Sequence, residues 1–412
     1  MRAPIAYLTC ELKGRDLDSR FLIAAELQKL GLYAVVGHYW GLKGSAPVAP
    51  KGCFLFKTTN TIQAGAMKAC RGIGYRVVAS DEEAIAQNEA NAPMTTDPMA
   101  IEHCDAFLTV NEGHKQGLLK KYPQARGKMD VVGSARFDIL RAVKTPRPRE
   151  RPYILVNMVF GLINGSWGDL DTAVDVYCRA LNLDLNDPAA KQQVEDRIAY
   201  ERAALRETEA LIDRLLAETA VEIVVRPHPS EEPAYWQRRY GAQPRVIVVG
   251  RSDPVPWIQH AAVMVHCDST TGIEAAILGT PCVNLSPDDA WASRLIISTA
   301  NYTVRDAEAA VDAIRVSLSG GAIPPAPRPG DDLFPKGAAK KTALAIKRLL
   351  PKPARLTEFM WNQIPLTDLQ KDKFTVTLDE AKASMERMFA LAGARPTALR
   401  VLDESVFLVS PP

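Results

Sequence analysis

Short runs of β-branched residues alternate along the chain with segments of helical spacing. The clearest three runs lie close together, at Glu222–Val225, Val246–Val249 and Val263–Val265, and each ends in a polar turn that contains Gly or Pro. Helix-like segments separate them. This alternation is typical of βα units in a parallel sheet that is buried on both faces. The pattern therefore predicts an α/β fold around residues 221–285.

The same alternation runs through the first half of the chain. Asp18–Leu30 has helical spacing and is followed by Gly31, which predicts a helix that ends there. Tyr153–Val156 begins a second series of strands. The strands predicted for the first series are Ile5–Thr9, Ala34–Val36, Cys53–Phe56, Arg76–Ala79, Ala106–Val110 and Met129–Val132.

A polar, proline-rich segment separates the two series. Val143–Pro152 can neither pack nor continue a helix, so we place the domain boundary there. A chain of 412 residues is long for a single core, and two domains are expected. We predict one domain at 1–145, a second at 152–350, and an extension at 351–412. The last helix of that extension, Leu378–Ala392, is expected to cross back onto the first domain.

Composition narrows the class of protein. With 47% hydrophobic and 24% charged residues, the sequence is typical of a soluble globular protein. Fifty basic residues against 48 acidic ones leave a net charge of +2, which gives no overall electrostatic footprint for nucleic acid. Seven cysteines without metal-ligand spacing indicate reduced thiols and a cytoplasmic location. No signal peptide opens the chain and no apolar run reaches ~18 residues, so we expect neither export nor a membrane span.

Two polar clusters follow predicted strands. Arg226–Pro229 (RPHP) comes directly after the first of the three central strands, and Asp268–Gly272 (DSTTG) follows the third. Ligands bind at the carboxyl ends of strands in an open α/β sheet, so both clusters are candidates for one site. Arg226 offers a bidentate donor for phosphate, and His228 is held between two prolines.

The second cluster precedes a predicted helix. Ser269, Thr270 and Thr271 bring hydroxyl groups to its N-terminus, where unpaired N–H groups and the helix dipole favour an anion. The alternative is purely structural, because Thr271 to Glu274 fits the S/T-x-x-E capping box. Together with Arg226, the hydroxyl groups predict a phosphate pocket.

Three further segments have two interpretations each. The loop Glu11–Asp16 is either a second site or a solvated turn. Ser80–Glu83 brings adjacent carboxylates to the end of a strand, where they act in acid–base chemistry or cap a helix. The basic stretch Lys340–Arg355 either rests on an anionic membrane surface, at about 1 kcal/mol per basic residue, or forms a solvated helix face. If the two halves face each other, the carboxylates lie across a cleft from the phosphate pocket, as glycosyl transfer requires.

These motifs resemble those of known transferases. An acidic pair, an HP dipeptide and a hydroxyl pair before a helix are similar to the D/E-D/E-G, HP and S-S/T motifs of bacterial transferases that use CMP-activated sialic acid or Kdo. The resemblance extends to surface-carbohydrate biosynthesis proteins related to the β-Kdo transferases, and it implies a GT-B architecture of two facing Rossmann-like domains with parallel sheets. The stretches that carry it are Glu11–Gly31, Ser80–Glu83, Gly133–Asp138, Arg226–Glu231 and Ser269–Ala275. GSARFD and RPHPSE also look like stretches of the polyol-phosphate transferases of teichoic-acid type.

The resemblance implies a role for each matching residue. Glu82 or Glu83 would be base or acid for the acceptor hydroxyl, although Ala84 stands where the motif has Gly. Arg226 and His228 would hold the donor phosphate and neutralise the departing CMP. The hydroxyl residues, Ser269, Thr270 and Thr271, would bind the same phosphate, and Glu274 would suit a ribose hydroxyl.

One position departs from the family. The β-Kdo transferases carry an Asp after the strand that opens the second domain, proposed as a nucleophile, and Asn157 stands there in this chain. An amide cannot be a comparable nucleophile. Either the mechanism differs, this copy is disabled, or the alignment slips and Asn164 or Asp169 corresponds instead.

The sequence thus predicts a cytoplasmic glycosyltransferase of capsule, O-antigen or lipopolysaccharide assembly. It would move a CMP-activated 2-keto sugar, with Kdo favoured, onto a saccharide or lipid-linked saccharide, with Lys13, Arg15 and Asp16 as acceptor-side candidates. We expect no metal and no cofactor besides the donor, since Arg226, His228 and a helix dipole supply the positive field. Peripheral membrane contact through 340–355 stays one of the two interpretations of that stretch, beside a solvated helix face, and we expect no nucleic-acid partner. The alternatives are a polyol-phosphate transferase with a CDP-linked donor, a non-catalytic nucleotide-sugar-binding protein and a sugar-nucleotide epimerase.

Overall fold

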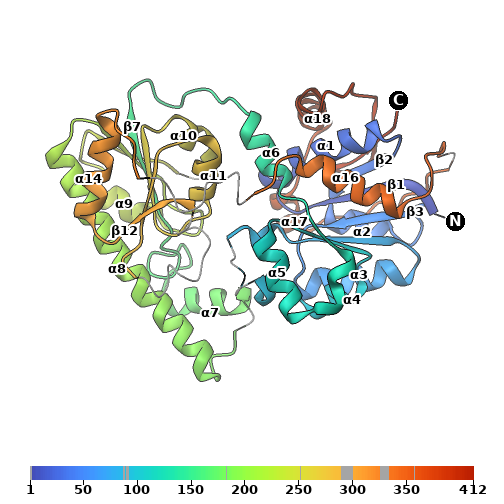
Figure 1. The fold of residues 1–412 in the computed structure, drawn as a ribbon, viewed down its shortest axis with the longest axis horizontal. Helices are drawn as coiled ribbons and strands as arrows, with labels where there is room; N and C mark the ends of the chain where they lie inside the picture. Colours follow the sequence, from blue (N-terminus) through green and yellow to red (C-terminus); the bar gives the residue numbers. More distant parts are fainter. Residues whose placement is uncertain are drawn as a thin grey trace. The chain divides into compact units, whose positions relative to one another are not determined.

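The protein folds into two compact α/β units in a computed structural model (Figure 1). Unit 1 comprises residues 1–143 and 334–412, and unit 2 comprises residues 144–333. The structure describes residues 2–412 except 87, 88, 90, 91, 182, 251, 289–299, 325–333 and 357. It leaves the side chains of residues 2, 83, 86, 94, 180 and 181 undescribed.

Unit 1 is built on an eight-stranded sheet with the order β13-β14-β2-β1-β3-β4-β5-β6. The six strands from the first part of the chain are parallel, whereas β14 pairs antiparallel with both β2 and β13. The strands are β1 (Arg2–Cys10), β2 (Tyr33–His38), β3 (Lys51–Phe56), β4 (Arg76–Ser80), β5 (Ala106–Thr109), β6 (Met129–Val131), β13 (Leu399–Asp403) and β14 (Val406–Val409).

Helices cover both faces of this sheet. On one face the core contains residues of α1 (Lys13–Lys29), α6 (Ala135–Ala142), α16 (Ala338–Leu349) and α18 (Leu378–Ala392). On the other face it contains residues of α2 (Tyr39–Ser45), α3 (Thr61–Gly72), α4 (Pro98–His103) and α5 (Glu112–Lys121). The remaining helical segments of unit 1 are η1 (Glu82–Ala86), η2 (Ala92–Met94), η3 (Pro123–Lys128) and α17 (Asp368–Lys373).

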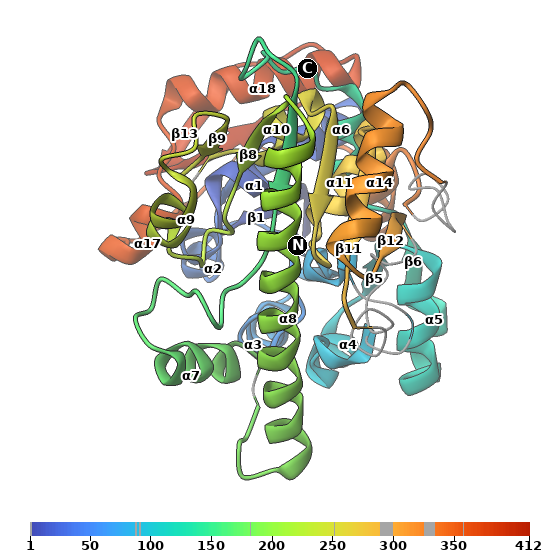
Figure 2. The same ribbon diagram turned by 90° about the vertical axis from the view of Figure 1, so that its left-hand side faces the viewer.

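Unit 2 has a six-stranded parallel sheet with the order β12-β11-β10-β7-β8-β9. Its strands are β7 (Tyr153–Asn157), β8 (Glu222–Val225), β9 (Val246–Val248), β10 (Val263–His266), β11 (Cys282–Leu285) and β12 (Tyr302–Val304). Residues of α8 (Pro188–Glu218), α9 (Pro233–Tyr240) and α14 (Ala307–Leu318) pack on one face, and residues of α10 (Pro254–His260) and α11 (Thr271–Leu278) on the other. The 31-residue α8, about 46 Å long at the usual rise, extends beyond the sheet toward α7 (Leu170–Leu181) (Figure 2).

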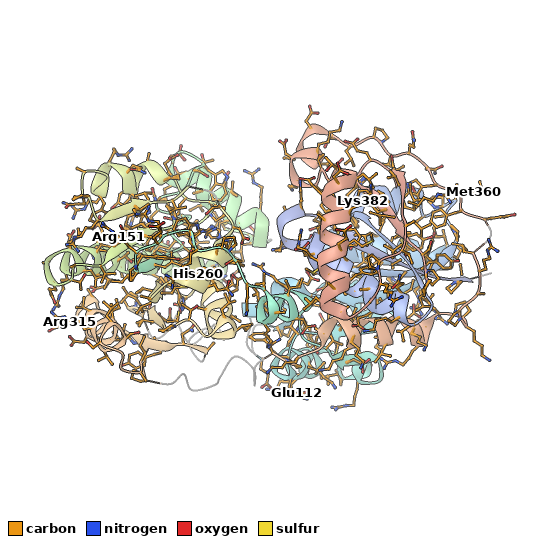
Figure 3. All side chains as sticks on the ribbon, turned by 90° about the horizontal axis from the view of Figure 1, so that it is seen from above. Glu112, Arg151, His260, Arg315, Met360 and Lys382 are labelled. Carbon is orange, nitrogen blue, oxygen red and sulfur yellow. The ribbon has the colours of Figure 1, made fainter. Side chains whose placement is uncertain are left out.

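The C-terminal part of the chain returns to unit 1. Figure 3 labels two of its residues, Met360 and Lys382, on that unit. Unit 2 ends at residue 333, before the limit of 350 that the sequence predicts for the second domain. The reason is that Ala343 and Ile346 of α16 enter the core beside α1.

The basic helix α16 therefore uses most of its apolar side chains inside the protein. Its buried residues face α1 and α6, while Leu344 is 40% exposed. Membrane contact through 340–355 stays one of two untested interpretations of that stretch. Within the described part of the chain, helices of the length and apolar character that a bilayer crossing requires are absent.

Candidate functional site

The candidate site lies at the carboxyl edge of the sheet in unit 2. The chain adds β8 and β9 on one side of β7, then reverses and adds β10, β11 and β12 on the other side. Such a reversal leaves a crevice outside the strand ends, where ligands bind in open α/β sheets. Asn157 ends β7, Arg226 follows β8, and Ser269 lies between β10 and α11.

A chain of hydrogen bonds joins these three segments. The amide Nδ2 of Asn157 donates to Oγ1 of Thr271 at 2.7 Å, and its Oδ1 accepts from Nη1 of Arg226 at 3.1 Å. Oγ of Ser269 lies 2.8 Å from Oγ1 of Thr271. The guanidinium and the two hydroxyl groups that we predicted to share a site are therefore linked through one amide.

The helix that follows, α11, begins without a side-chain cap from its N-cap residue. Its N-cap residue, Thr270, has helical backbone angles and makes no side-chain cap bond, and Thr271 is already the first helical residue. The predicted capping box between Thr271 and Glu274 is therefore wrong. Thr270 is exposed, while Ser269 and Glu274 are buried. The N-terminus of α11 keeps nearby hydroxyl groups and the positive end of a dipole, which favour an anion. Its first N–H groups already have acceptors, since that of Thr271 donates to Oγ of Ser269 at 3.4 Å and that of Gly272 donates to the backbone oxygen of Ser269 at 2.9 Å.

Arg226 is a buried cation with an unused donor. The residue is 5% exposed, and its Nη2 donates to the backbone oxygen of Ser252 at 2.5 Å. Its Nε has no hydrogen-bond partner among the described residues. Burial lowers the pKa of Arg226, and the negative charges of Glu274 and Asp253 act in the opposite direction. Because a desolvated guanidinium binds phosphate strongly, this residue is well suited to an anionic ligand.

His228 is hydrogen-bonded within its own loop, and its role toward a phosphate stays a prediction. Its Nδ1 accepts from the backbone N–H of Ser230 at 3.2 Å and lies 2.7 Å from that residue's Oγ. The imidazole therefore carries its proton on Nε2. Desolvation and the charges of Arg226 and Arg197 lower the pKa of His228, although the residue as a whole is exposed. It is a neutral donor near Arg226, bonded to its own loop.

The loop that holds His228 is anchored by a buried carboxylate. Oε1 of Glu231 accepts from the backbone N–H of His228 at 2.9 Å, and Oε2 accepts from Nε1 of Trp236 at 3.2 Å. Burial raises the pKa of Glu231 to about 7, and the hydrogen bonds that it accepts act to lower it. Glu231 belongs to the RPHPSE stretch, but its structural role was not apparent from the sequence.

A second imidazole, which the sequence analysis did not single out, supports the Ser269 loop. Nδ1 of His266 accepts from the backbone N–H of Ser269 at 3.2 Å, and its Nε2 lies 3.0 Å from Oδ1 of Asn301. Nδ2 of Asn301 in turn donates to the backbone oxygen of Gly272 at 3.1 Å. Burial lowers the pKa of His266 to about 4, so the ring is neutral at pH 7. In the sequence, His266 is the polar residue that ends the apolar run VMVH, and this position is the signal from which its role could have been suspected.

Asp268 gives the loop its unusual turn. It has a φ of +43°, in a region that side-chain-bearing residues seldom occupy, though Asp tolerates it better than most. Its backbone N–H donates to Oδ1 of Asn284 at 2.9 Å, and its carboxylate accepts from Ser286 at 2.8 Å and from the hydroxyl of Tyr200. These buried contacts fix the backbone that presents Ser269.

The other sequence candidates in unit 2 have local structural roles. Oδ1 of Asp169 accepts from the N–H of Thr172 at 2.8 Å, which caps the start of a helix. Asn164 donates to the carboxylate of Glu231 at 3.3 Å. Neither residue belongs to the hydrogen-bond chain of Asn157.

Most of the predicted site residues in unit 1 form ion pairs with other residues of that unit. Nη1 of the fully buried Arg20 lies 2.7 Å from Glu82. Lys13 pairs with Glu380 at 2.5 Å, and Asp16 pairs with Lys57 at 3.0 Å. Arg15 lines a pocket of ≈ 550 Å³ in unit 1 together with Glu11 and Leu12. The side chain of Glu83 lies outside the part of the chain that the structure describes.

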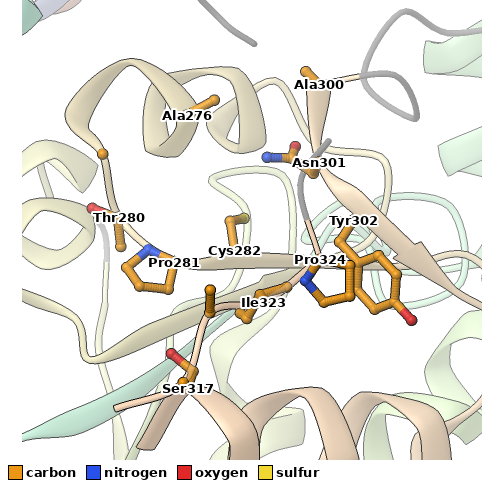
Figure 4. Close-up of a pocket in the computed structure, with 13 residues that line it drawn as sticks. Ala276, Thr280, Pro281, Cys282, Ala300, Asn301, Tyr302, Ser317, Ile323 and Pro324 are labelled. Carbon is orange, nitrogen blue, oxygen red and sulfur yellow. The ribbon is translucent and has the colours of Figure 1, made fainter. Parts of the chain in front are cut away.

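A hollow of ≈ 340 Å³ lies at the opposite edge of the sheet in unit 2, near the amino ends of β11 and β12 (Figure 4). Pro281, Tyr302 and Ile323 are among the thirteen residues that line it, and none of the thirteen is charged. It lacks the cations that a phosphate needs. No group of three or more His, Cys, Asp or Glu residues within the described ranges could hold a metal ion.

Comparison with solved structures identifies the fold. The UDP-GlcNAc 2-epimerase of Neisseria meningitidis bound to UDP-GlcNAc matches with a TM-score of 0.51 at 11% identity, over 84% of this chain and 100% of that one. A second UDP-N-acetylglucosamine 2-epimerase matches with a TM-score of 0.51 at 12% identity, over 83% and 94%. The protein thus has a two-domain α/β fold of the GT-B-like kind, as predicted. No protein-family model and no curated protein sequence matches the chain.

Proposed function

We propose that this protein is an enzyme that acts on a nucleotide-activated sugar and binds the nucleotide's phosphate at the carboxyl edge of unit 2. The observation that carries the proposal is the link from Arg226 through Asn157 to Thr271 at the N-terminus of α11. A buried guanidinium, two hydroxyl groups and a helix dipole converge there, and together they match the charge and the acceptors of a phosphate. The structurally similar epimerase of Neisseria meningitidis, which is bound to UDP-GlcNAc, supports the same ligand class.

For the reaction we propose glycosyl transfer to a saccharide, with a CMP-linked sugar such as CMP-Kdo as donor. In this step the acceptor oxygen forms a bond to the anomeric carbon, the bond from that carbon to the phosphate oxygen breaks, and the acceptor proton passes to a base. The nucleoside phosphate leaves as an anion, which Arg226 would stabilise. With an amide at position 157, a covalent sugar–enzyme intermediate at that residue is not part of the proposal. Glu82 and Glu83 stay candidates for the base.

Binding is tested with a panel of nucleotides. CMP-Kdo, CDP-glycerol, UDP-GlcNAc, CMP and UDP are each added to the protein, and the melting temperature is measured. A ligand held by the native state raises it, by mass action. We expect at least one of them to stabilise the protein, and to lose that effect in Arg226→Ala but not in Arg238→Ala, which removes an exposed arginine of α9. If none of the five shifts the melting temperature, the proposal fails.

The products then separate the reactions. Release of CMP that depends on a saccharide acceptor indicates glycosyl transfer. A product that contains phosphorus indicates polyol-phosphate transfer from a CDP-linked donor. An epimer formed from UDP-GlcNAc alone indicates a sugar-nucleotide epimerase, and binding without turnover indicates a sensor or scaffold. Each of the last three outcomes overturns the proposal of glycosyl transfer but keeps the phosphate site.

A further inference from the structure

We propose that Trp167 is a ligand-binding residue, whose indole ring forms a stacking surface for the sugar of a nucleotide sugar. It lies in the loop 158–169, which follows β7 and begins directly after Asn157. This loop leaves the carboxyl edge of the sheet in unit 2, where ligands bind in open α/β folds. The inference rests on the proposed function, because it concerns the part of the ligand that lies beyond the phosphate.

Trp167 differs from the other tryptophans in its exposure. The residue is 41% exposed, whereas those elsewhere in the described part of the chain are half-buried or buried, namely Trp40, Trp236, Trp257 and Trp361. Single exposed apolar residues are common on protein surfaces, so exposure alone does not indicate a ligand. An exposed indole that the fold holds rigidly beside a binding site is different, because it offers apolar contact area without a large loss of conformational entropy.

The first part of the loop is held by a buried carboxylate of α8. Oε2 of Glu201 accepts from the backbone N–H groups of Leu162 at 2.9 Å and Ile163 at 3.3 Å. Glu201 is 2% exposed, and its Oε1 accepts from Arg197 at 2.9 Å. Hydrogen bonds to a charged acceptor are stronger than those between neutral groups. The loop is therefore fixed to the helix that lies behind it.

The second part of the loop is bonded to the RPHP segment. The backbone N–H of Ser166 donates to the backbone oxygen of Ser230 at 2.9 Å, and that of Glu232 donates to the oxygen of Asn164 at 2.8 Å. Oγ of Ser230 in turn lies 2.7 Å from Nδ1 of His228. Trp167 directly follows Ser166. The indole is thus carried by backbone that is tied to the same segment as His228.

The ring itself rests on the loop. A Cβ atom at Gly165 would lie 3.3 Å from Cε3 of Trp167 and 2.5 Å from the backbone oxygen of Gly161. The indole therefore packs beside a position that only glycine fills without displacing the backbone. One side of the ring is supported by the protein, and the exposed remainder is available to a ligand.

His228 lies between the phosphate position and the indole. α11 packs on one face of the sheet and α8 on the other, so a ligand whose phosphate meets Thr271 crosses the strand ends to reach Trp167. Burial lowers the pKa of His228, and the positive charges of Arg226 and Arg197 act in the same direction, which places the imidazole near both cations. A ligand that extends from the phosphate toward Trp167 would therefore pass His228.

The groups around the indole match a sugar. Ser166 brings an exposed hydroxyl group, Asn164 a half-buried amide, and His228 an N–H donor at Nε2. Each hydroxyl group of a sugar both donates and accepts, so it can bond to groups of this kind while the C–H face of the ring packs on the indole. A nucleobase, which also stacks on aromatic rings, is the alternative that the test separates.

The test compares nucleotides with and without a sugar. CMP, CMP-Kdo, UDP and UDP-GlcNAc are titrated into the full chain by calorimetry. Trp167→Leu should weaken binding of at least one nucleotide sugar by about tenfold and leave CMP and UDP unchanged, while Trp167→Phe, which keeps a ring, should lose less. Leu185→Ala is the matched control, because Leu185 is also 41% exposed in unit 2, and it should bind all four ligands as the unmodified protein does.

Fluorescence gives a second measurement. Acrylamide quenches exposed tryptophans, and the nucleotide sugar that binds should protect part of the emission of the unmodified protein. Trp167→Phe should abolish this protection, since it removes the exposed indole and leaves the buried and half-buried ones. Protection that persists in Trp167→Phe would contradict contact between this residue and the ligand.

The outcomes separate this inference from the proposed function. If nucleotides bind but Trp167→Leu and Leu185→Ala have the same affinities for the nucleotide sugars, the inference fails and the phosphate site stands. Equal weakening of the nucleotides and the nucleotide sugars in Trp167→Leu would assign the indole to the base and overturn the sugar contact. If none of the four ligands binds the unmodified protein, the proposed function fails, and the sugar contact fails with it.

Discussion

Nδ2 of Asn157 lies 2.7 Å from Oγ1 of Thr271, so the last residue of β7 is tied to the first residue of α11. The same amide accepts from Nη1 of Arg226 through its oxygen. A carboxylate in this position could accept from both partners but could donate to neither. Under the proposed function, Asn157 would be a positioning residue, which aligns a guanidinium and a hydroxyl group for one ligand.

Asn157→Asp tests this role. The new carboxylate would bring a negative charge beside the phosphate position, and we expect nucleotide binding to weaken by about tenfold or more. Isothermal titration with the nucleotide that stabilises the protein in the panel measures the effect. Asn164→Asp places the same change of charge outside the hydrogen-bond chain and serves as control. A gain of transfer activity with a trapped sugar–enzyme adduct would show instead that position 157 takes a nucleophile.

Arg226→Ala should weaken nucleotide binding by about 100-fold, since a hydrogen bond to a charged group contributes about 1.5–3 kcal/mol. The variant also frees the backbone oxygen of Ser252 and the amide oxygen of Asn157. Equilibrium titration of the nucleotide is the measurement, with Arg238→Ala as the variant of equal charge. Equal affinities in the two variants would contradict a phosphate role for Arg226.

The stability of unit 2 should depend on pH through His266. Burial lowers the pKa of its imidazole from 6.5 to about 4 in the folded protein, whereas the unfolded chain keeps the ordinary value. Below pH 6.5 the unfolded state therefore binds more protons, and the free energy of unfolding falls as the pH decreases toward 4. Between pH 7.5 and 4.5 the loss due to this group is about 2–3 kcal/mol.

His266→Asn isolates that contribution, since its amide oxygen can still accept from the backbone N–H of Ser269. Other buried histidines, such as His114, also titrate in this range, so the quantity to compare is the difference between the unmodified protein and the variant. Urea unfolding of both proteins at pH 7.5 and at pH 4.5 gives the free energies of unfolding from which this difference is obtained. The same pH dependence in both proteins would contradict a neutral, buried His266.

Gly272→Ala should destabilise the protein. A Cβ atom at this position would lie 2.3 Å from Nε2 of His266 and 2.4 Å from Oδ1 of Asn301, so the bonded pair would have to move. Overpacking of this kind costs about 1–3 kcal/mol. Gly65→Ala in α3 is the control, because its Cβ meets nothing within 4 Å, and there we expect a gain of about 0.5–1 kcal/mol. The melting temperatures of both variants, measured by thermal unfolding, test this difference.

The strands of both sheets were largely predictable because their residues are apolar on both faces. β8 has the predicted limits, Glu222–Val225, and β10 extends the predicted run by one residue, His266. The pair β13 and β14 was missed. Val406–Val409 is a short apolar run near the end of the chain, and nothing local in it specifies that it pairs antiparallel with β2, more than 360 residues earlier.

The candidate site was predictable in part for a related reason. Arg226, Ser269 and Thr271 come after strands that a sequence pattern can locate, and their proximity follows from the order of a parallel sheet. The contact of His266 with Asn301 depends on a later loop and on the absence of a Cβ at Gly272, which are tertiary properties. The capping box failed because α11 starts one residue earlier than that motif requires, so that Thr271 is the first helical residue and not the N-cap.

Unit 1 is assembled from two parts of the chain, and β14 covers the edge of β2 only when the second part arrives. A ribosome delivers residues from the N-terminus onward, so all of unit 2 is synthesised before α18 and β14. Until then α1 lacks α16 and α18, and a nascent chain exposes both an apolar helix face and an unpaired strand edge. The completed protein thus depends on a late docking event, during which chaperones would have a defined surface to protect.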